Sequence, residues 1–245
     1  MTLTGMPDCH PGGSGVVRGA RSTKPPIRAR NGRLSQGRAA IRPLFATQVL
    51  EATLADAPDF AAFNAELAEA CAMLAAEDKA GQAWCREHGY AGYTSYASLG
   101  DLPQRASVFG ELKRRLDKHA ARFAADLAFD LGPRGKLKLD SLWVNVLKPG
   151  GAHSGHVHPH SVLSGSVYVA TPSGAGALRL EDPRLPLMMA APPRRADAPA
   201  EAQTFVTLTP SPGALYMWES WLRHEVLPSR AKAPRVSLSF NYAWT

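Results

Sequence analysis

The strongest constraint on the fold lies between residue 136 and the C-terminus, where short β-type runs alternate with Gly and Pro. Seven such runs fall within about 110 residues, in the order KLDSLWVNVL, SGSVYVA, ALRLE, TFVTLT, GALYMW, RHEVL and RVSLSFNYAW. They are rich in β-branched and aromatic residues, which is the composition of strands. Many short strands separated by turns predict an antiparallel sandwich or a jelly-roll barrel.

The last run, residues 235–244, alternates polar and apolar side chains with a period of two. This period places the two kinds on opposite faces of a strand. One face is expected to pack against a core, and the other either lines a wet pocket or faces solvent. The apolar positions are Val236, Leu238, Phe240 and Tyr242, and the polar positions are Arg235, Ser237, Ser239 and Asn241.

Two amphipathic segments that precede the β-rich part predict helices. The first covers residues 59–80, with Asp59 placed as an N-cap and Gly81 placed to end it. The second covers residues 101–131 and stops at a Gly-Pro pair. The expected fold class is therefore α+β and mainly β, with a jelly-roll core and two flanking N-terminal helices.

A chain of 245 residues is long enough for one domain with a sizeable core. We expect this domain over residues 43–245, with helical support over 55–131 and the jelly-roll core over 136–245. A Pro- and Ala-rich interruption at residues 182–203 is typical of either a functional lid or a disordered connection.

The formal charge of +7 is confined to residues 1–42, which hold eight Lys/Arg against Asp8 alone. A Gly-, Ser- and Arg-rich segment with few apolar residues predicts a disordered tail, with a nucleic-acid-binding arm as the alternative. The remaining residues balance 20 basic against 20 acidic side chains. We therefore do not expect nucleic acid as a partner of the domain.

The cellular setting follows from the cysteines and from the hydropathy. The three cysteines form no CxxC pair and predict neither a disulfide framework nor a zinc ribbon. No apolar run approaches the roughly 20 residues of a membrane span, and the N-terminus has no signal-peptide core. These features predict a cytoplasmic protein without a membrane partner, and none of them indicates an oligomeric state.

Histidines are crowded just before residue 161, where four of the eight in the chain lie. Residues two apart on an extended strand point to the same face, so His156 and His158 can offer two imidazoles to one ion. Pro159 tends to end strand pairing, which favours this pair over one that includes His160. His224, on a later strand, can complete a three-ligand set that leaves positions open, as catalytic metals require.

Four segments carry a resemblance to a known family. They are WVNVLKPGGAHSGHVHPHSVLSGSVYVATP, LRLEDPR, PGALYMWESWLRHEV and RVSLSFNYAW. Together they resemble the 2-oxoglutarate- and Fe(II)-dependent oxygenase superfamily, in particular a bacterial oxygenase family with an HxH…H iron motif. The resemblance covers roughly residues 43–245 and implies a double-stranded β-helix.

The resemblance also implies a role for particular residues. Iron would be held by His156, His158 and His224. Arg235 and Ser237 would grip the distal carboxylate of 2-oxoglutarate, and the cosubstrate pocket would further include Tyr168, Asn145 and Asn241.

The sequence departs from the usual iron triad and from the family pattern at two positions. His158 stands where the usual triad has a carboxylate, which predicts an all-histidine centre. Glu219 stands where the family pattern has Pro before the Ser-Trp pair. His160 and the oddly spaced His153 are not expected to be ligands.

The implied activity is oxidation of a C–H bond of a small-molecule or peptide-type substrate by dioxygen, with conversion of 2-oxoglutarate to succinate and carbon dioxide. One alternative is a three-histidine oxygenase of the thiol-dioxygenase kind, in which the substrate itself chelates iron and Arg235 binds its carboxylate. Another is a non-catalytic metal-binding module with a nucleic-acid-binding tail. No motif identifies the substrate.

Overall fold

The computed structural model describes residues 41–245 of the chain. The predicted basic tail, residues 1–42, lies almost wholly outside the described residues. Among the residues that are described, no helix is both long enough and apolar enough to cross a membrane.

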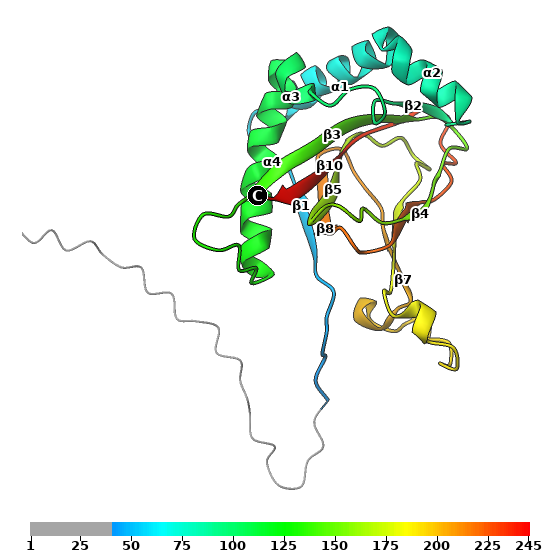
Figure 1. Ribbon diagram of the computed structural model, residues 1–245. Coiled ribbons are helices and arrows are strands. Elements are labelled where there is room, and N and C mark those ends of the chain that lie inside the picture. Colours follow the sequence, from blue (N-terminus) through cyan, green and yellow to red (C-terminus); the bar gives the residue numbers. More distant parts are fainter. Residues whose placement is uncertain (1–40) are drawn as a thin grey trace, which may run out of the picture. The chain divides into compact units, whose positions relative to one another are not determined.

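Two antiparallel sheets form the body of residues 45–245 (Figure 1). The larger sheet has the strand order β1-β8-β5-β10-β3-β2, and the smaller has the order β4-β9-β6-β7. The strands are β1 Val49–Thr53, β2 Gly92–Thr94, β3 Leu137–Leu147, β4 His153–His156, β5 Leu163–Ala170, β6 Leu178–Glu181, β7 Phe205–Leu208, β8 Ala214–Glu219, β9 His224–Val226 and β10 Arg235–Trp244.

The strands from β3 to β10 carry the chain back and forth between the two sheets. In the larger sheet β3 lies beside β10 and β5 beside β8, while in the smaller sheet β4 lies beside β9 and β6 beside β7. This nesting of early strands against late ones is the double-stranded β-helix that the sequence predicts. All seven predicted runs are strands, with ends shifted by one or two residues.

The period-two alternation separates an apolar core from a polar interior. Leu238 and Phe240 of β10 are fully buried and pack with helical residues in the main core. The alternate residues of β10, such as Arg235 and Ser237, are also buried but lie on the side of the smaller sheet. Of the two possibilities for the polar face, lining the interior is therefore confirmed.

Helices cover the apolar face of the larger sheet (Figure 1). Leu112 and Leu116 have no exposed surface and pack into the core beneath the sheet. The helices are α1 Phe60–Glu77, α2 Lys79–Glu87, α3 Leu102–Arg105 and α4 Ser107–Asp126.

The helical part thus holds four helices where the sequence predicts two. Gly81 does not end the first helix, because Asp78 accepts a hydrogen bond from the Gly81 N–H (2.9 Å) and thereby caps a new helix in which Gly81 is buried. Asp59 makes no capping hydrogen bond and instead pairs with Arg115 (2.5 Å). The second predicted helix is broken at Ala106, whose backbone is extended.

The second predicted helix also ends earlier than expected. It stops at Asp126, and Ala128 then takes a left-handed conformation (φ 57°) while the Phe129 N–H bonds the Ala124 carbonyl (3.0 Å). This is a helix-ending turn of the Schellman type. The Gly-Pro pair at residues 132–133 is therefore not what ends the helix.

The long connection between β6 and β7 projects from the smaller sheet as a separate arm (Figure 1). It carries two short 3₁₀ turns, Leu185–Leu187 and Ala200–Ala202. The arm closes on itself, because the Gln203 side chain donates a hydrogen bond to the Ala198 carbonyl (2.7 Å).

Candidate metal centre

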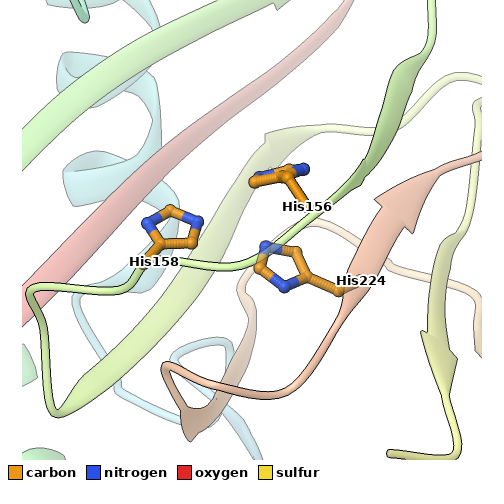
Figure 2. Close-up of side chains that lie close together, drawn as sticks. All are labelled: His156, His158 and His224. Carbon is orange, nitrogen blue, oxygen red and sulfur yellow. The ribbon is translucent and has the colours of Figure 1, made fainter.

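Three histidines, two at the ends of neighbouring strands and one in the turn after β4, lie close together (Figure 2). His156 is the last residue of β4, His224 is the first residue of β9, and the two are cross-strand partners. His158 follows two residues after β4. One ring nitrogen from each residue lies within 4.8 Å of the other two. The sequence-predicted trio is thus brought together.

The path of the backbone between His156 and His158 differs from the prediction. The two were expected on one extended strand, but β4 ends at His156. His158 is instead held in a turn: its N–H bonds the Ser220 carbonyl (3.0 Å), and its carbonyl accepts from the Ser161 N–H (3.2 Å). The hydrogen bond to Ser220 holds His158 against the turn that precedes β9, so His156 and His158 both still face His224.

Backbone carbonyls orient two of the three rings. His224 Nδ1 lies 2.9 Å from the Leu222 carbonyl oxygen, and His156 Nδ1 lies 2.7 Å from the Ser154 carbonyl oxygen. A carbonyl oxygen can only accept a hydrogen bond, so Nδ1 carries the proton in each ring. The lone pair of Nε2 is then free, which is the usual state of a metal-ligating histidine.

Burial keeps the deeper imidazoles neutral. It lowers the pKa of His224 to about 3 and that of His158 to about 4. A divalent metal binds only neutral imidazole, so both residues are ready to bind metal at neutral pH without losing a proton. The three rings have the geometry for one metal ion with a histidine-only ligand set.

The centre is open on one side. The His156 side chain is exposed and that of His158 is partly buried, whereas His224 is buried. Trp143 stacks beside His158 with ring centroids 6.0 Å apart, and the exposed Tyr96 meets the edge of Trp143 at 5.3 Å.

Trp218 borders the buried side of the centre. It is buried in the smaller core cluster and meets the His224 ring at 4.6 Å. Its indole N–H has no hydrogen-bond partner within residues 41–245.

The remaining histidines of the crowded segment lie outside the trio. His160 is exposed. His153 turns to Tyr90, whose hydroxyl lies 2.8 Å from His153 Nε2. Neither offers an atom to the three-nitrogen cluster.

A buried arginine lies in the same interior. Arg235 has only 2% of its surface exposed, and no carboxylate among residues 41–245 pairs with it. Nη1 donates to the Gly176 carbonyl (2.8 Å) and Nη2 donates to Ser237 Oγ (3.3 Å), whereas Nε has no partner in the part of the chain that the structure describes. A buried cation without a counter-charge is costly, so the surroundings of Arg235 favour an anionic ligand.

The residues predicted to surround the cosubstrate form a row across the larger sheet. Ser237 of β10 pairs with Asn145 of β3 on one side and with Tyr168 of β5 on the other. The guanidinium carbon of Arg235 lies 5.2 Å from the centroid of the Tyr168 ring. Arg235, Ser237, Tyr168 and Asn145 are therefore neighbours.

Asn241 lies further along the strand, away from Arg235. Its amide is bonded to Ser141 (3.1 Å) and Ser164 (2.8 Å), and its side chain also acts on His158, whose pKa it raises against the effect of burial. Asn241 is thus placed at the metal end of the interior.

Sequence reasoning misses Tyr90, which reaches this interior from the segment between α2 and β2. Its hydroxyl contacts both His153 and Asn145. No motif surrounds Tyr90, and a tyrosine after a helix is an ordinary core residue. Only the three-dimensional contacts single it out.

The fold and the site define a class of structure: a double-stranded β-helix with three clustered histidines that can hold a metal and a buried arginine on the last strand. Residues 141–241 match the family model described as "Putative 2OG-Fe(II) oxygenase". The match lies within the strands from β3 to β10 and shows that this part of the chain resembles that family.

Solved structures with the same fold include several enzymes at low sequence identity. A prolyl-4-hydroxylase from Pseudomonas putida is 18% identical, with 80% of this chain and 92% of that chain covered, at a TM-score of 0.51. AviO1 from Streptomyces viridochromogenes Tue57 is 15% identical, with 81% and 90% covered, at 0.54. EctD from S. alaskensis, solved with 2-oxoglutarate and 5-hydroxyectoine, is 18% identical, with 81% and 72% covered, at 0.54. No sequence among the curated proteins matches this chain.

Proposed function

We propose that the protein is an Fe(II)- and 2-oxoglutarate-dependent dioxygenase that hydroxylates a C–H bond of a small-molecule or peptide-type substrate and releases succinate and carbon dioxide. The observation that carries the proposal is the buried Arg235, which has no counter-charge in the described chain and shares an interior with the three histidines. A dicarboxylate ligand can bind to both groups, with one end at a metal held by the histidines and the other end at the Arg235 guanidinium.

The residues divide into two groups along this interior. His156, His158 and His224 would hold Fe(II), and three neutral ligands leave half of an octahedron free for the cosubstrate and dioxygen. Arg235, with Ser237 beside it, would hold the distal carboxylate of 2-oxoglutarate. When bound, iron and 2-oxoglutarate supply the oxidising chemistry.

The protein's own contribution is orientation and the exclusion of water. Tyr168 is fully buried, and burial raises the pKa of its hydroxyl to about 12, so it remains a neutral neighbour of the guanidinium. In such an enclosed site a charge-assisted contact between Arg235 and a carboxylate is stronger than in water. The solvent-exposed side of the centre, at His156, is left for the prime substrate.

The test is anaerobic addition of Fe(II) and then 2-oxoglutarate to the full chain, while the visible charge-transfer band of the iron–oxoacid chelate is followed. The band should appear with 2-oxoglutarate and not with succinate, which lacks the keto group. Air should then yield succinate. If the iron-loaded protein binds no 2-oxoglutarate, the proposal fails. The better hypothesis is then a three-histidine oxygenase whose substrate itself chelates iron.

A further inference from the structure

Tyr90 is held firmly at the arginine end of the interior. Its N–H bonds the Cys85 carbonyl at the end of α2, and its own carbonyl accepts from the Gly92 N–H, each at 2.8 Å. Gly92 has φ 144°, and a Cβ there would lie 2.0 Å from the Val146 carbonyl oxygen, so this turn requires glycine. The segment thus leaves the Tyr90 ring little freedom to move.

The Tyr90 hydroxyl connects the two sheets. It lies 2.8 Å from Nε2 of His153, on β4 of the smaller sheet, and 3.3 Å from Oδ1 of Asn145, on β3 of the larger sheet. Asn145 is fixed in turn, because Thr94 donates to the same oxygen (2.9 Å) and the Asn145 amide nitrogen donates to Ser239 (3.1 Å). The hydroxyl therefore closes the space between the sheets at this end.

Strand register places this closure next to Arg235. Leu147 of β3 is paired with Arg235 on one side and with Gly92 on the other. Burial raises the pKa of Tyr90 and lowers that of His153 to about 4, and the positive charge of Arg235 acts on both groups. Tyr90 and His153 are thus neutral at neutral pH, and neither can serve as the counter-charge of the guanidinium.

We propose that Tyr90, braced by His153, forms the end wall of the anion pocket at Arg235 and limits the length of the 2-oxo dicarboxylate that the pocket accepts. The inference rests on the proposed function. It assigns the choice of cosubstrate partly to a residue outside the family-matched range 141–241. The ligand class is a five-carbon 2-oxo dicarboxylate, and the excluded homologue is 2-oxoadipate, which is one methylene longer.

The reason is steric. A ring held by two backbone hydrogen bonds and by a hydroxyl bonded to both sheets cannot easily make room for one more methylene. One methylene in a closed pocket typically changes affinity about 10- to 200-fold. Removing the ring should erase that discrimination while leaving the guanidinium and the three histidines in place.

The experiment compares binding of 2-oxoglutarate and 2-oxoadipate to the full-length, Zn(II)-loaded protein by calorimetry, so that no turnover is required. Wild type should prefer 2-oxoglutarate by roughly tenfold or more. Tyr90→Ala should bring the two affinities close together, and Tyr90→Leu should do so partly. Tyr90→Phe keeps the ring and should keep the preference.

Tyr93→Phe is the matched control. Tyr93 is a buried tyrosine three residues further on, whose hydroxyl bonds Asp78 (2.9 Å) away from the interior. Its loss should lower the melting temperature without changing the ratio of the two affinities. Should Tyr90→Ala not fold, Tyr90→Leu decides the question in the same way.

The outcomes separate the inference from the proposed function. A wild type that binds neither oxoacid would overturn the proposed function. A wild type that binds 2-oxoglutarate selectively, together with folded Tyr90→Ala and Tyr90→Leu variants that keep the same selectivity, would overturn only the role of Tyr90.

Discussion

At the residue scale, three imidazoles carry the whole of the proposed metal affinity. Replacing His156, His158 or His224 with Ala should reduce affinity for Fe(II) or Zn(II) by more than the 10- to 100-fold that loss of an outer partner of a metal ligand costs. The measurement is the metal content of each purified variant after exchange into metal-free buffer.

His160→Ala serves as the control for these variants. His160 lies two residues from His158 but is exposed and outside the cluster, so its loss should leave the metal content unchanged. Equal metal loss in His160→Ala would show that the ligand set has been chosen wrongly.

Arg235 is the residue on which cosubstrate binding depends most. Arg235→Ala would leave a ligand carboxylate desolvated and unpaired, which costs about 2–5 kcal/mol of binding free energy. Arg235→Lys should recover only part of this loss, because an ammonium cannot reproduce the planar fork of donors. Titration of metal-loaded variants with 2-oxoglutarate measures both effects.

The matched control for Arg235 is Arg195→Ala. Arg195 is an exposed arginine of the β6–β7 arm that pairs with Asp197 (2.9 Å). The Arg195→Ala protein should bind metal and 2-oxoglutarate as tightly as wild type does. If Arg235→Ala also binds 2-oxoglutarate as tightly as wild type, the carboxylate is anchored elsewhere.

At the scale of elements, the packing of α4 under the larger sheet sets stability rather than chemistry. Leu112 has no exposed surface and lies in the main core, on the face of the sheet opposite to the polar interior. Leu112→Ala should lower the free energy of unfolding by about 2–5 kcal/mol through the lost transfer energy and the cavity left behind. Urea unfolding measures the loss.

Met73→Ala, at an exposed position of α1, should change the free energy of unfolding far less. Both variants should retain their metal when folded, because neither position touches the interior. Loss of metal from a fully folded Leu112→Ala protein would show that the helices also set the geometry of the centre.

The elements that sequence reasoning finds are those with a clear period. β5 and β10 alternate and are predicted nearly to the residue, and β8 is marked by its continuous apolar run. β2 has three residues and is stabilised by pairing with β3, a contact between residues about 50 apart, so no local pattern marks it. The four residues of β4 include Ser154 and Gly155 and lack any apolar repeat.

The candidate site follows the same division. His156 and His158 are predictable from their i, i+2 spacing, His224 because it is the one histidine after His160 in the sequence, and Arg235 because it begins an alternating strand. Tyr90 is not predictable, because its role arises from contacts with residues 55 and 63 positions away. The turn that holds His158 depends likewise on a backbone bond to Ser220.

At the scale of the whole molecule, the fold buries several histidine side chains and keeps their imidazoles neutral. The apolar faces of the larger sheet and the helices form one core, and a second, smaller core lies between the sheets around Trp218. Several histidines therefore sit in a low-dielectric interior, where the charged form of an imidazole is disfavoured. This arrangement couples the stability of the metal-free protein to pH.

The metal-free protein should lose stability as the pH falls from about 6.5 towards 4. Burial lowers the pKa of His224 to about 3 and the pKa values of His158 and His153 to about 4, against 6.5 for an ordinary histidine. Between these values the unfolded chain binds protons that the folded chain does not. The free energy of unfolding therefore rises with pH in this range. The contribution of these histidines is fully present above about pH 6.5 and is lost as the pH falls through about 4.

Between pH 7 and pH 5 the histidines contribute most of the change. The carboxyl groups with shifted pKa values are shifted downward from 3.8 for Asp78 and Asp182 and from 4.5 for Glu111, so they titrate mainly below pH 5. Urea unfolding of the metal-free protein at pH 7 and pH 5 should show the loss. His153→Gln and His158→Gln should each reduce it, since each removes one group that must stay neutral, whereas His160→Gln should not. An unfolding free energy that does not differ between the two pH values would mean that these imidazoles are hydrated in the folded protein, and the argument for a preformed neutral metal site would fall with it.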